Sequence, residues 1–587
     1  MQFGYADDLA LLHNSSTPEA NVVALQQDLE NILTWGDTMG ISFDPGKSEL
    51  MHFTRRPRVS NPDLHSQIHP CWSIPATPLN KPMRWLGVWY DRRLSFQPHV
   101  RIVKARGLQT AAHLKALSST VRGLSPLVAR AAAVACIPSS IFYAAESWWQ
   151  VCTAHCDCER STRPQSLSSN EHQLNIVLSA MCRAILPVYK TTPTAALFRE
   201  AGIPPAKAWL NEASGRMALR TQRLDIWHPL VTRATNLESW RSNKSRLARA
   251  FALLETPIER ITPLRSPPWT HQPSNTELHR RVGYSATMKT AEGYRYQEWL
   301  HSIPPSAVLA FSDGSQAANQ HTGSGWVLYH HSNILQQGVL PLGTAMEVFD
   351  AEATAAYCAL KNASKYAHLG PVYLCLDNLA VATRIVAPET CCSSQQIFDK
   401  IHALLANFPS LHGVPTVRWV PGHSQSHGND KADLLAKEGT TSLATFRYIS
   451  YARARRALCI QKWALADAHF THHQSARYRL LNLNARNVPK ELQLSRYTLG
   501  KLLACRSGHG DFEAYHIRFT HHDANMRCQC GLPKTPDHFS SCLAVPRRFR
   551  FSNTHTSLAL LSTFNGSLRF EAWVQKTNYF NQYWSQH

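Results

Sequence analysis

Four segments between residues 306 and 440 each carry an acidic residue at the edge of an apolar stretch, and this pattern constrains the fold more than any other feature. The segment AVLAFSDGSQ predicts a buried strand that ends in Asp313, and PVYLCLDNLA predicts another that ends in Asp377. The segment EVFDAEATAAYCALKNA predicts a helix with Glu352 in its first turn, and the helix that follows TVRWVPGH contains Asp433. The predicted order is three strands, a helix, a strand, helices, a strand and a helix, which is an α/β fold.

Carboxylates carried by separate elements can converge at one end of a sheet. Mg²⁺ prefers oxygen ligands of this kind, and two such ions about 3.5–4 Å apart can hold the attacking and leaving oxygens of a phosphodiester. Each acid also has an ordinary explanation. Asp313 precedes a glycine as turn residues do, Glu352 suits the positive end of its helix, and Asp433 fits a solvated helix face. Their order and context together favour a metal site.

These motifs resemble ribonuclease H of type 1. The resemblance rests on DGS at Asp313, AE at Glu352, LDN at Asp377 and GHSQSHGNDKAD with His423 and Asp433, and it covers residues 306–440. It implies a ribonuclease H-like mixed five-stranded sheet flanked by helices, and Mg²⁺-dependent (or Mn²⁺-dependent) hydrolysis of the RNA strand in an RNA/DNA hybrid. It implies that four of these residues are catalytic metal ligands, namely Asp313, Glu352, Asp377 and Asp433. His423, on its loop, would help to protonate or release the product near neutral pH.

The stretch FGYADDLALL, residues 3–12, predicts a β-hairpin with two acids at its tip. Together with GISFDPGKSEL and RWLGVWYD, it resembles the second half of a reverse transcriptase palm from a fungal-type non-LTR (LINE-like) retrotransposon. The resemblance implies that Tyr5, Asp7 and Asp8 belong to the catalytic box and Lys47 to the box that follows it. Such a polymerase needs a further Asp on an earlier strand. We therefore expect a truncated palm, with DNA synthesis only where a second chain supplies the missing part.

Composition divides the chain into five predicted segments. They are a partial reverse transcriptase palm at 1–95, a helical thumb and connection at 96–255, a Pro-rich linker at 256–305, the ribonuclease H domain at 306–440 and a basic helical C-terminal region at 441–587.

Charge is distributed unevenly along the chain, whose net charge is +21. Residues 306–440 contain 7 basic and 10 acidic residues, whereas residues 441–587 contain 20 basic and 7 acidic residues. Basic flanks around an acidic module predict binding to the nucleic acid backbone as well as to the hybrid. We expect no membrane partner because we find no apolar stretch of about 18 residues. No signal peptide is recognised at the start of the sequence, and the retrotransposon resemblance implies an intracellular, nuclear protein. The oligomeric state is not indicated.

A cysteine–histidine cluster lies near the C-terminus, in the segment CQCGLPKTPDHFSSC at 528–542. Three thiolates and one imidazole make a closed tetrahedral set for Zn²⁺, with free thiols in a turn as the alternative. The predicted ligands are Cys528, Cys530, His538 and Cys542, in the spacing C-x-C-x7-H-x3-C. The segment also resembles the C-terminal cysteine–histidine (CCHC) knuckle of the same retrotransposons. A second group around Cys152, Cys156 and Cys158 is too closely spaced for easy closure and predicts a plain loop.

These patterns together predict an RNA–DNA hybrid ribonuclease inside a truncated retrotransposon reverse transcriptase. Three alternatives remain open. One is an RNA-directed DNA polymerase completed by a missing palm, another is a catalytically inactive nucleic-acid-binding remnant, and the third is a structural component of a particle, for which the sequence offers no positive signal.

Overall fold

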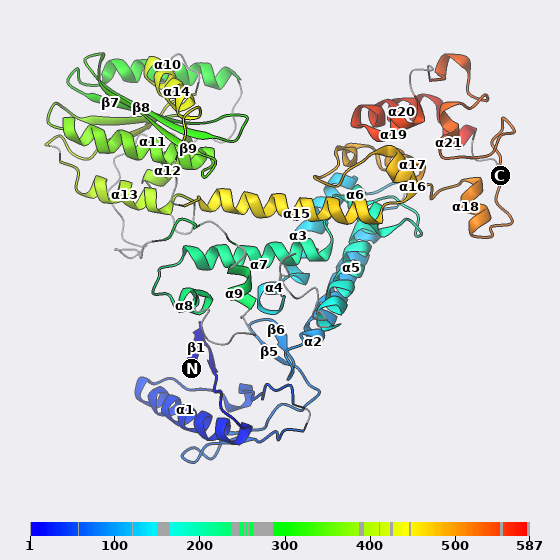
Figure 1. Cartoon of the computed structure of the whole chain (residues 1–587), viewed down its shortest axis with the longest axis horizontal. Coiled ribbons are helices and arrows are strands. Elements are labelled where there is room, and N and C mark those ends of the chain that lie inside the picture. The colour runs from blue at the N-terminus through cyan, green and yellow to red at the C-terminus, as the bar shows by residue number, and fades with distance from the viewer. Residues whose placement is uncertain are drawn as a thin grey trace. The chain divides into compact units, whose positions relative to one another are not determined.

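The computed structural model divides into two compact units, which are described separately below (Figure 1). The first comprises Met1–Ala213 and Lys462–His587, and the second comprises Ser214–Gln461. The predicted segments 96–255 and 441–587 each contribute residues to both units. The structure describes residues 2–56, 58–119, 121–149, 165–235, 246–251, 254, 257–261, 286–386, 393–409, 411–422, 426–444, 448–551 and 556–583.

The second unit is built on a mixed five-stranded sheet. Its antiparallel meander consists of β7 (Val308–Gln316), β8 (Thr322–His330) and β9 (Asn333–Gly343). Strands β10 (Val372–Leu376) and β11 (Thr416–Trp419) extend the sheet in parallel beyond β7, so that the strand order is β11–β10–β7–β8–β9. The predicted mixed five-stranded sheet is confirmed.

Helices cover both faces of this sheet (Figure 1). Successive side chains of a strand point to opposite faces, and accordingly Ala310 packs with α11 in one apolar cluster while Phe311 packs with α14 in another. The helices of this unit, apart from the parts of α7 and α15 that extend into it, are α8 (Pro229–Thr235), α9 (Arg246–Phe251), α10 (Ala286–Ser302), α11 (Val348–Ala363), α12 (Leu379–Val386), α13 (Gln395–Ala406) and α14 (His427–Gly439).

Two glycines let the helices approach the sheet closely. A Cβ on Gly314 of β7 would lie 2.4 Å from the backbone nitrogen of Glu352 in α11. A Cβ on Gly325 of β8 would lie 2.2 Å from the backbone nitrogen of Ala436 in α14. Since atoms do not approach that closely, both positions require glycine, and the two helices that carry acidic residues lie directly on the backbone of the sheet.

Part of the predicted linker contributes to the second unit. Helix α10 lies within residues 256–305 and buries Tyr296 in the cluster that covers the α14 face of the sheet. The Tyr296 hydroxyl lies 3.1 Å from the Ser426 hydroxyl, and the ring of Trp299 meets that of Tyr373 edge-on at 5.5 Å between centroids. The aromatic residues of α10 therefore pack on the sheet.

The first unit begins with small β-hairpins and one long helix. Helix α1 starts after Thr17, whose hydroxyl accepts the backbone N–H of Ala20, and ends at Gly40, whose φ of +70° suits glycine. The elements of this part are β1 (Gln2–Tyr5), β2 (Asp8–Leu11), α1 (Pro18–Met39), β3 (Leu64–His65), β4 (Ser73–Ile74), β5 (Met83–Trp85) and β6 (Val88–Tyr90).

The rest of the first unit is helical and has one large core. Ile137 and Val177 from the N-terminal part share this core with Leu502 and Phe570 from the C-terminal part. The helices, of which α7 and α15 contain residues of both units, are α2 (Gln97–Ala116), α3 (Pro126–Ile141), α4 (Ala145–Trp148), α5 (Gln165–Ile185), α6 (Thr194–Ala201), α7 (Ala206–Arg223), α15 (Tyr451–His473), α16 (Ala476–Leu481), α17 (Arg496–Ser507), α18 (Glu513–Arg518), α19 (Ser557–Ser562), α20 (Phe564–Thr577) and α21 (Tyr579–Gln582).

One expectation about apolar stretches is wrong. The helical stretch Pro126–Trp148 is long and apolar enough to cross a membrane, by length and composition only. Ile137, Ile141, Ala145 and Trp148 within it are buried in the core of the first unit. A core helix of a soluble protein passes the same test, so one such helix is weak support for a membrane span.

A buried ionic network links α6 to α17 within the first unit. The Arg506 guanidinium, which is 0% exposed, lies 3.0 Å from Glu200 Oε2 and 2.7 Å from Glu491 Oε1. Glu200 also pairs with Arg199 at 2.7 Å and accepts the Tyr478 hydroxyl at 3.0 Å. Two charges of each sign therefore neutralise one another away from water.

Removing one member of this network should destabilise the first unit strongly. We expect Glu200→Ala to lower its free energy of unfolding by about 3 kcal/mol, because the buried arginines lose a charged partner. Urea unfolding monitored by tryptophan fluorescence measures the change. The control is Asp44→Ala, since Asp44 pairs with Lys47 at 3.7 Å on the surface, where such pairs contribute little. Equal unfolding midpoints for Glu200→Ala and Asp44→Ala would contradict the prediction.

Candidate active site and metal centre

Four acidic residues from four elements line one cleft in the second unit. Asp313 lies on β7, Glu352 on α11, Asp377 directly after β10 and Asp433 on α14. The cleft has a volume of about 190 Å³, and Asn429 and Asp430 complete its lining. Carboxylate oxygens of Asp313, Glu352 and Asp377 all lie within 4.8 Å of one another, which is close enough to share a metal ion.

The parallel pairing of β7 with β10 explains why two of these acids meet. Leu376, the last residue of β10, is opposite Ser312 of β7. Asp377 follows Leu376 and Asp313 follows Ser312, so both carboxylates emerge at the same edge of the sheet. Because Gly314 has no side chain, α11 can bring Glu352 against the same edge.

Burial and mutual repulsion raise the pKa values of two carboxyl groups in this cleft. Burial, followed by repulsion from Asp377, raises the pKa of the Asp313 carboxyl to about 7. Burial and then the nearby Asp313 and Asp377 carboxylates raise the pKa of Glu352 well above its usual range. Unbalanced negative charge in a buried cleft is stabilised by a cation, and a divalent ion supplies the most charge in the least space.

Hydrogen bonds position Asp377. Trp419 donates its indole N–H to the Asp377 backbone carbonyl at 2.8 Å, and Asn429 donates its side-chain amide to Asp377 Oδ2 at 3.4 Å. Within the described part of the chain, Glu352 Oε2 and Asn429 Oδ1 are buried without a hydrogen-bond partner. Buried oxygens without a donor are suited to a cation, so the residues present fit a Mg²⁺ or Mn²⁺ site.

The remaining residues of the predicted set differ in their placement. Asp433 lines the cleft and pairs with Lys437 at 2.6 Å, one helical turn away. His423 lies outside the described residues, between Gly422 and Ser426. Sequence reasoning missed Asn429 and Asp430, although their spacing from Asp433, four and three residues, places all of them on one face of a helix.

The hairpin of β1 and β2 carries the polymerase-like motif in the first unit. Tyr5 is opposite Asp8, and Ala6 adopts a φ of +53° in the two-residue turn that it forms with Asp7. Tyr5, Asp7 and Asp8 are exposed, as is Lys47. Among the described residues, Asp7 and Asp8 do not belong to a group of three metal-ligating side chains. The predicted hairpin is present, with Asp7 in its turn and Asp8 at the start of β2.

A second group of metal-ligating side chains lies in the first unit. Ligand atoms of Cys528, Cys530, His538 and Cys542 all lie within 4.8 Å of one another. Cys528 Sγ is 3.6 Å from Cys542 Sγ, and Cys530 Sγ is 3.3 Å from His538 Nε2. Burial above all raises the pKa of the Cys528 thiol to about 12, a shift that a coordinated metal ion reverses.

A tight turn brings the first two cysteines together. Gly531, with a φ of +82°, donates its backbone N–H to the Cys528 carbonyl at 2.9 Å. The backbone N–H of Cys528 in turn donates to the Leu532 carbonyl at 2.9 Å. His538 begins a short 3₁₀ turn, and Cys542 follows it. This donor set fits Zn²⁺. The group around Cys152, Cys156 and Cys158 lies outside the described residues.

Comparison with known proteins assigns a domain to the second unit. The RNase H family model matches residues 305–441. The chain therefore contains an RNase H domain, and the carboxylate cleft lies within it. None of the curated proteins compared with the chain matches it.

Several solved structures are similar to this segment. RNase H1 from Halobacterium salinarum is 24% identical, covering 23% of this chain and 96% of its own, with a TM-score of 0.20. Prototype foamy virus protease–reverse transcriptase is 22% identical, covering 24% of this chain and 22% of its own, with a TM-score of 0.21. LC11-RNase H1, isolated from compost and solved with an RNA/DNA hybrid, is 14% identical. The match covers 22% of this chain and 97% of LC11-RNase H1, with a TM-score of 0.19. The domain assignment rests on the family match.

Without divalent cations, the cleft should make stability fall as pH rises. The pKa of Asp313 is about 7 in the folded chain, against an ordinary value of 3.8. The folded state binds this proton more tightly, so the resulting stability is full below about pH 4 and is lost as pH rises through about 7.

Thermal unfolding in a chelator, followed from about pH 4 to pH 7, measures this loss. Asp313→Asn cannot ionise at this position, so its melting temperature should fall less over the same range. Mg²⁺ should restore the wild-type protein at neutral pH by balancing the carboxylates. If the melting temperatures of wild type and Asp313→Asn change equally with pH and Mg²⁺ changes neither, the carboxylates of the cleft do not destabilise the folded protein by mutual repulsion.

Proposed function

We propose that the chain hydrolyses the RNA strand of RNA/DNA hybrids with divalent metal ions, Mg²⁺ or Mn²⁺. One observation carries the proposal: three carboxylates, two of them buried and the third, that of Asp377, half-buried, lie within 4.8 Å of one another in a cleft of an RNase H domain. The proposed metal ligands are Asp313, Glu352, Asp377 and Asp433. The type 1 assignment and the hybrid substrate come from the motif resemblance, and one similar structure was solved with an RNA/DNA hybrid.

The chain's own residues would hold and orient the reactants. Two bound ions would supply Lewis acidity that activates water and stabilises the departing oxygen of the phosphodiester. Asn429 and Trp419 hold Asp377 in position through the hydrogen bonds described above. His423 would deliver or remove a proton near neutral pH, and its replacement should slow turnover on the order of 10²-fold.

We also propose that the chain is part of a fungal-type non-LTR retrotransposon polyprotein and acts in the nucleus. The ordered motifs support this proposal: a YADD hairpin, a GKS segment, an RNase H domain and a C-terminal cysteine–histidine cluster. In this assignment Tyr5, Asp7, Asp8 and Lys47 derive from a polymerase palm, and α2, α3 and α5 derive from the thumb and connection.

The cysteine–histidine cluster is proposed to bind one Zn²⁺. Three thiols and one imidazole within 4.8 Å of one another form a donor set for a closed structural site. Cys528, His538 and Cys542 are buried, so the ion would hold together the turn, the 3₁₀ segment and the end of the chain that packs on them. Gln529, beside the first ligand, donates its side-chain amide to the Gln582 carbonyl at 2.8 Å.

Cleavage of a labelled hybrid tests the ribonuclease proposal. In Mg²⁺ or Mn²⁺ the full chain should cut the RNA strand and leave single-stranded RNA and duplex DNA largely intact. Asp313→Asn and Asp377→Asn should abolish turnover because each removes a charged ligand, while circular dichroism shows that both remain folded. Asp399→Asn is the matched control, since Asp399 is bonded to Gln395 on α13 and lies outside the cleft. A folded wild-type chain that cuts no hybrid in either metal would favour an inactive nucleic-acid-binding remnant instead.

Metal analysis of the purified full chain tests the zinc proposal. We expect one equivalent of zinc, lost in Cys530→Ser, with lower thermal stability of the first unit because binding energy becomes folding energy. Cys71→Ser removes an exposed thiol outside the cluster and should retain the metal. Freshly prepared wild-type protein without zinc, or a Cys530→Ser variant that retains it, would exclude the site.

A further inference from the structure

A row of aromatic and imidazole rings lies on the first unit, away from its pocket-lining residues. Phe519 is 4.7 Å from Tyr515 between ring centroids, and its plane is 27° from that of His521. Tyr515 also meets Tyr189 at 5.7 Å. The complete row consists of six rings, Tyr189, His509, Tyr515, His516, Phe519 and His521.

Polar contacts hold four of these rings, His509, Tyr515, His516 and His521, in fixed orientations. The Tyr515 hydroxyl lies 2.9 Å from the Thr191 hydroxyl, which is also 3.1 Å from His509 Nδ1. His516 bonds to Asp511 through Nε2 at 2.7 Å and faces His521 Nδ1 at 3.1 Å through its own Nδ1. A ligand that stacks on this row would therefore meet rings that are already oriented, which lowers the entropic cost of binding.

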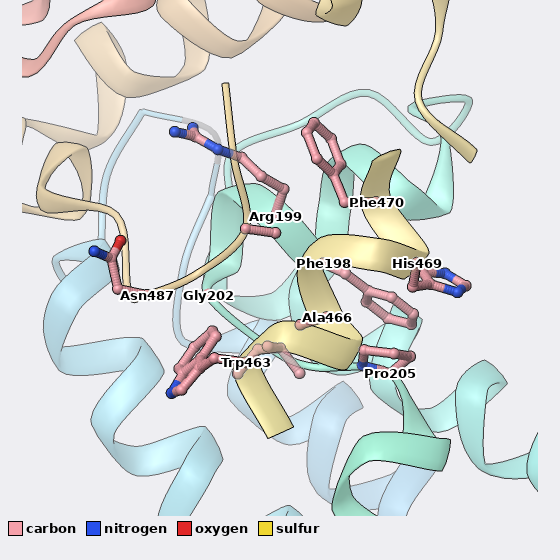
Figure 2. Close-up of a pocket in the computed structure, with 11 residues that line it drawn as sticks. Phe198, Arg199, Gly202, Pro205, Trp463, Ala466, His469, Phe470 and Asn487 are labelled. Atoms are coloured by element: carbon pink, nitrogen blue, oxygen red, sulfur yellow. The ribbon is translucent and has the colours of Figure 1, made fainter. Parts of the chain in front are cut away.

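The row reaches the surface. Tyr189 is 41% exposed, and His521 and His522 are exposed beside it in the chain segment that follows α18. By contrast, the cavity between α6 and α15 is small, about 10 Å³, and is walled by Phe198, Trp463 and Phe470, as Figure 2 shows. That cavity has room for little more than one water molecule, whereas the exposed rings of the row can be contacted by a larger ligand.

Exposed cations accompany the rings. The Arg518 guanidinium carbon lies 5.5 Å from the centroid of Phe519, and Lys190, the residue after Tyr189 in the chain, is exposed. Asp511, an acid beside the row, is neutralised by Lys534 at 2.9 Å and by contact with His516. Cations next to aromatic faces are the combination that binds phosphates and bases at the same time.

We propose that this row is a binding surface for single-stranded nucleic acid, separate from the carboxylate cleft. Unpaired bases would stack on Tyr189, Phe519 and His521, while Arg518 and its neighbours contact the phosphates. Stacking requires bases whose faces are open, so the surface selects single strands over duplexes. The C-terminal region, with 20 basic and 7 acidic residues, supplies the favourable field around it. The proposal does not rest on ribonuclease activity.

The test measures binding of oligouridylate, oligodeoxythymidylate and a duplex DNA by the full chain that carries Asp313→Asn, so that turnover plays no part. Phe519→Leu keeps an apolar side chain but removes the ring, and Tyr189→Ala removes the exposed ring. Each should weaken single-strand binding about tenfold, including at high salt, where phosphate contacts contribute little. Phe519→Tyr keeps the ring and should bind normally, as should Trp35→Ala, which removes a ring that is 48% exposed elsewhere in the unit.

The outcomes separate the alternatives. Loss of oligouridylate binding alone supports the proposal with RNA as the ligand, and loss of both oligonucleotides supports it for single strands in general. Arg518→Gln should weaken binding mainly at low salt, because it removes a phosphate contact. The proposal is overturned if Tyr189→Ala and a folded Phe519→Leu bind both oligonucleotides as the parent does. It is also overturned if these two substitutions weaken the binding of duplex DNA as much as the binding of single strands.

Discussion

The parallel pairing of β7 with β10 is the constraint on which the candidate site depends. It places the residues after Ser312 and Leu376 at one edge of the sheet, and both are aspartates. Glycine at 314 then lets α11 add Glu352 to the same edge. Three carboxylates so close together repel one another, and their burial prevents water from screening that repulsion. The fold thereby concentrates negative charge where a divalent cation would balance it, and this cleft lies within the segment that the RNase H family model matches.

The first unit depends on a different principle, because its core is shared by chain segments that are distant in sequence. Arg506 from the C-terminal part is fully buried against Glu200 from the N-terminal part, and the apolar core contains residues of both parts. The N-terminal helices and the C-terminal region are therefore one folded body. The cysteine–histidine cluster lies in the same body, as does the row of aromatic rings around Tyr515.

The motifs in the sequence and the resemblance that they carry predicted the mixed five-stranded sheet and the four acidic residues of the cleft, but not the residues around them. Strand patterns and the acids at strand ends predicted the order of strands and helices along the chain, and the structure brings Asp313, Glu352, Asp377 and Asp433 to one cleft. Asn429 was missed because a single amide on a helix carries no distinctive signal until its neighbour, Asp377, is known. Helix α10 was assigned to a linker because the Pro-rich stretch before it dominates the local composition, whereas its aromatic residues reveal their role only by packing on the sheet.

The sequence by itself determined the chemistry that this chain can offer: four carboxylates in a set order, a C-x-C-x7-H-x3-C ligand group and a strongly basic C-terminal region. These follow from residue type and spacing, which are local properties. Only the tertiary structure decided which residues lie together. The raised pKa of Asp313 requires burial beside Asp377, the pairing of Glu200 with Arg506 requires two distant segments to fold as one, and the ring row requires Tyr189 to meet Tyr515. Charge repulsion, desolvation and packing act through space, so their effects appear only when the chain has folded.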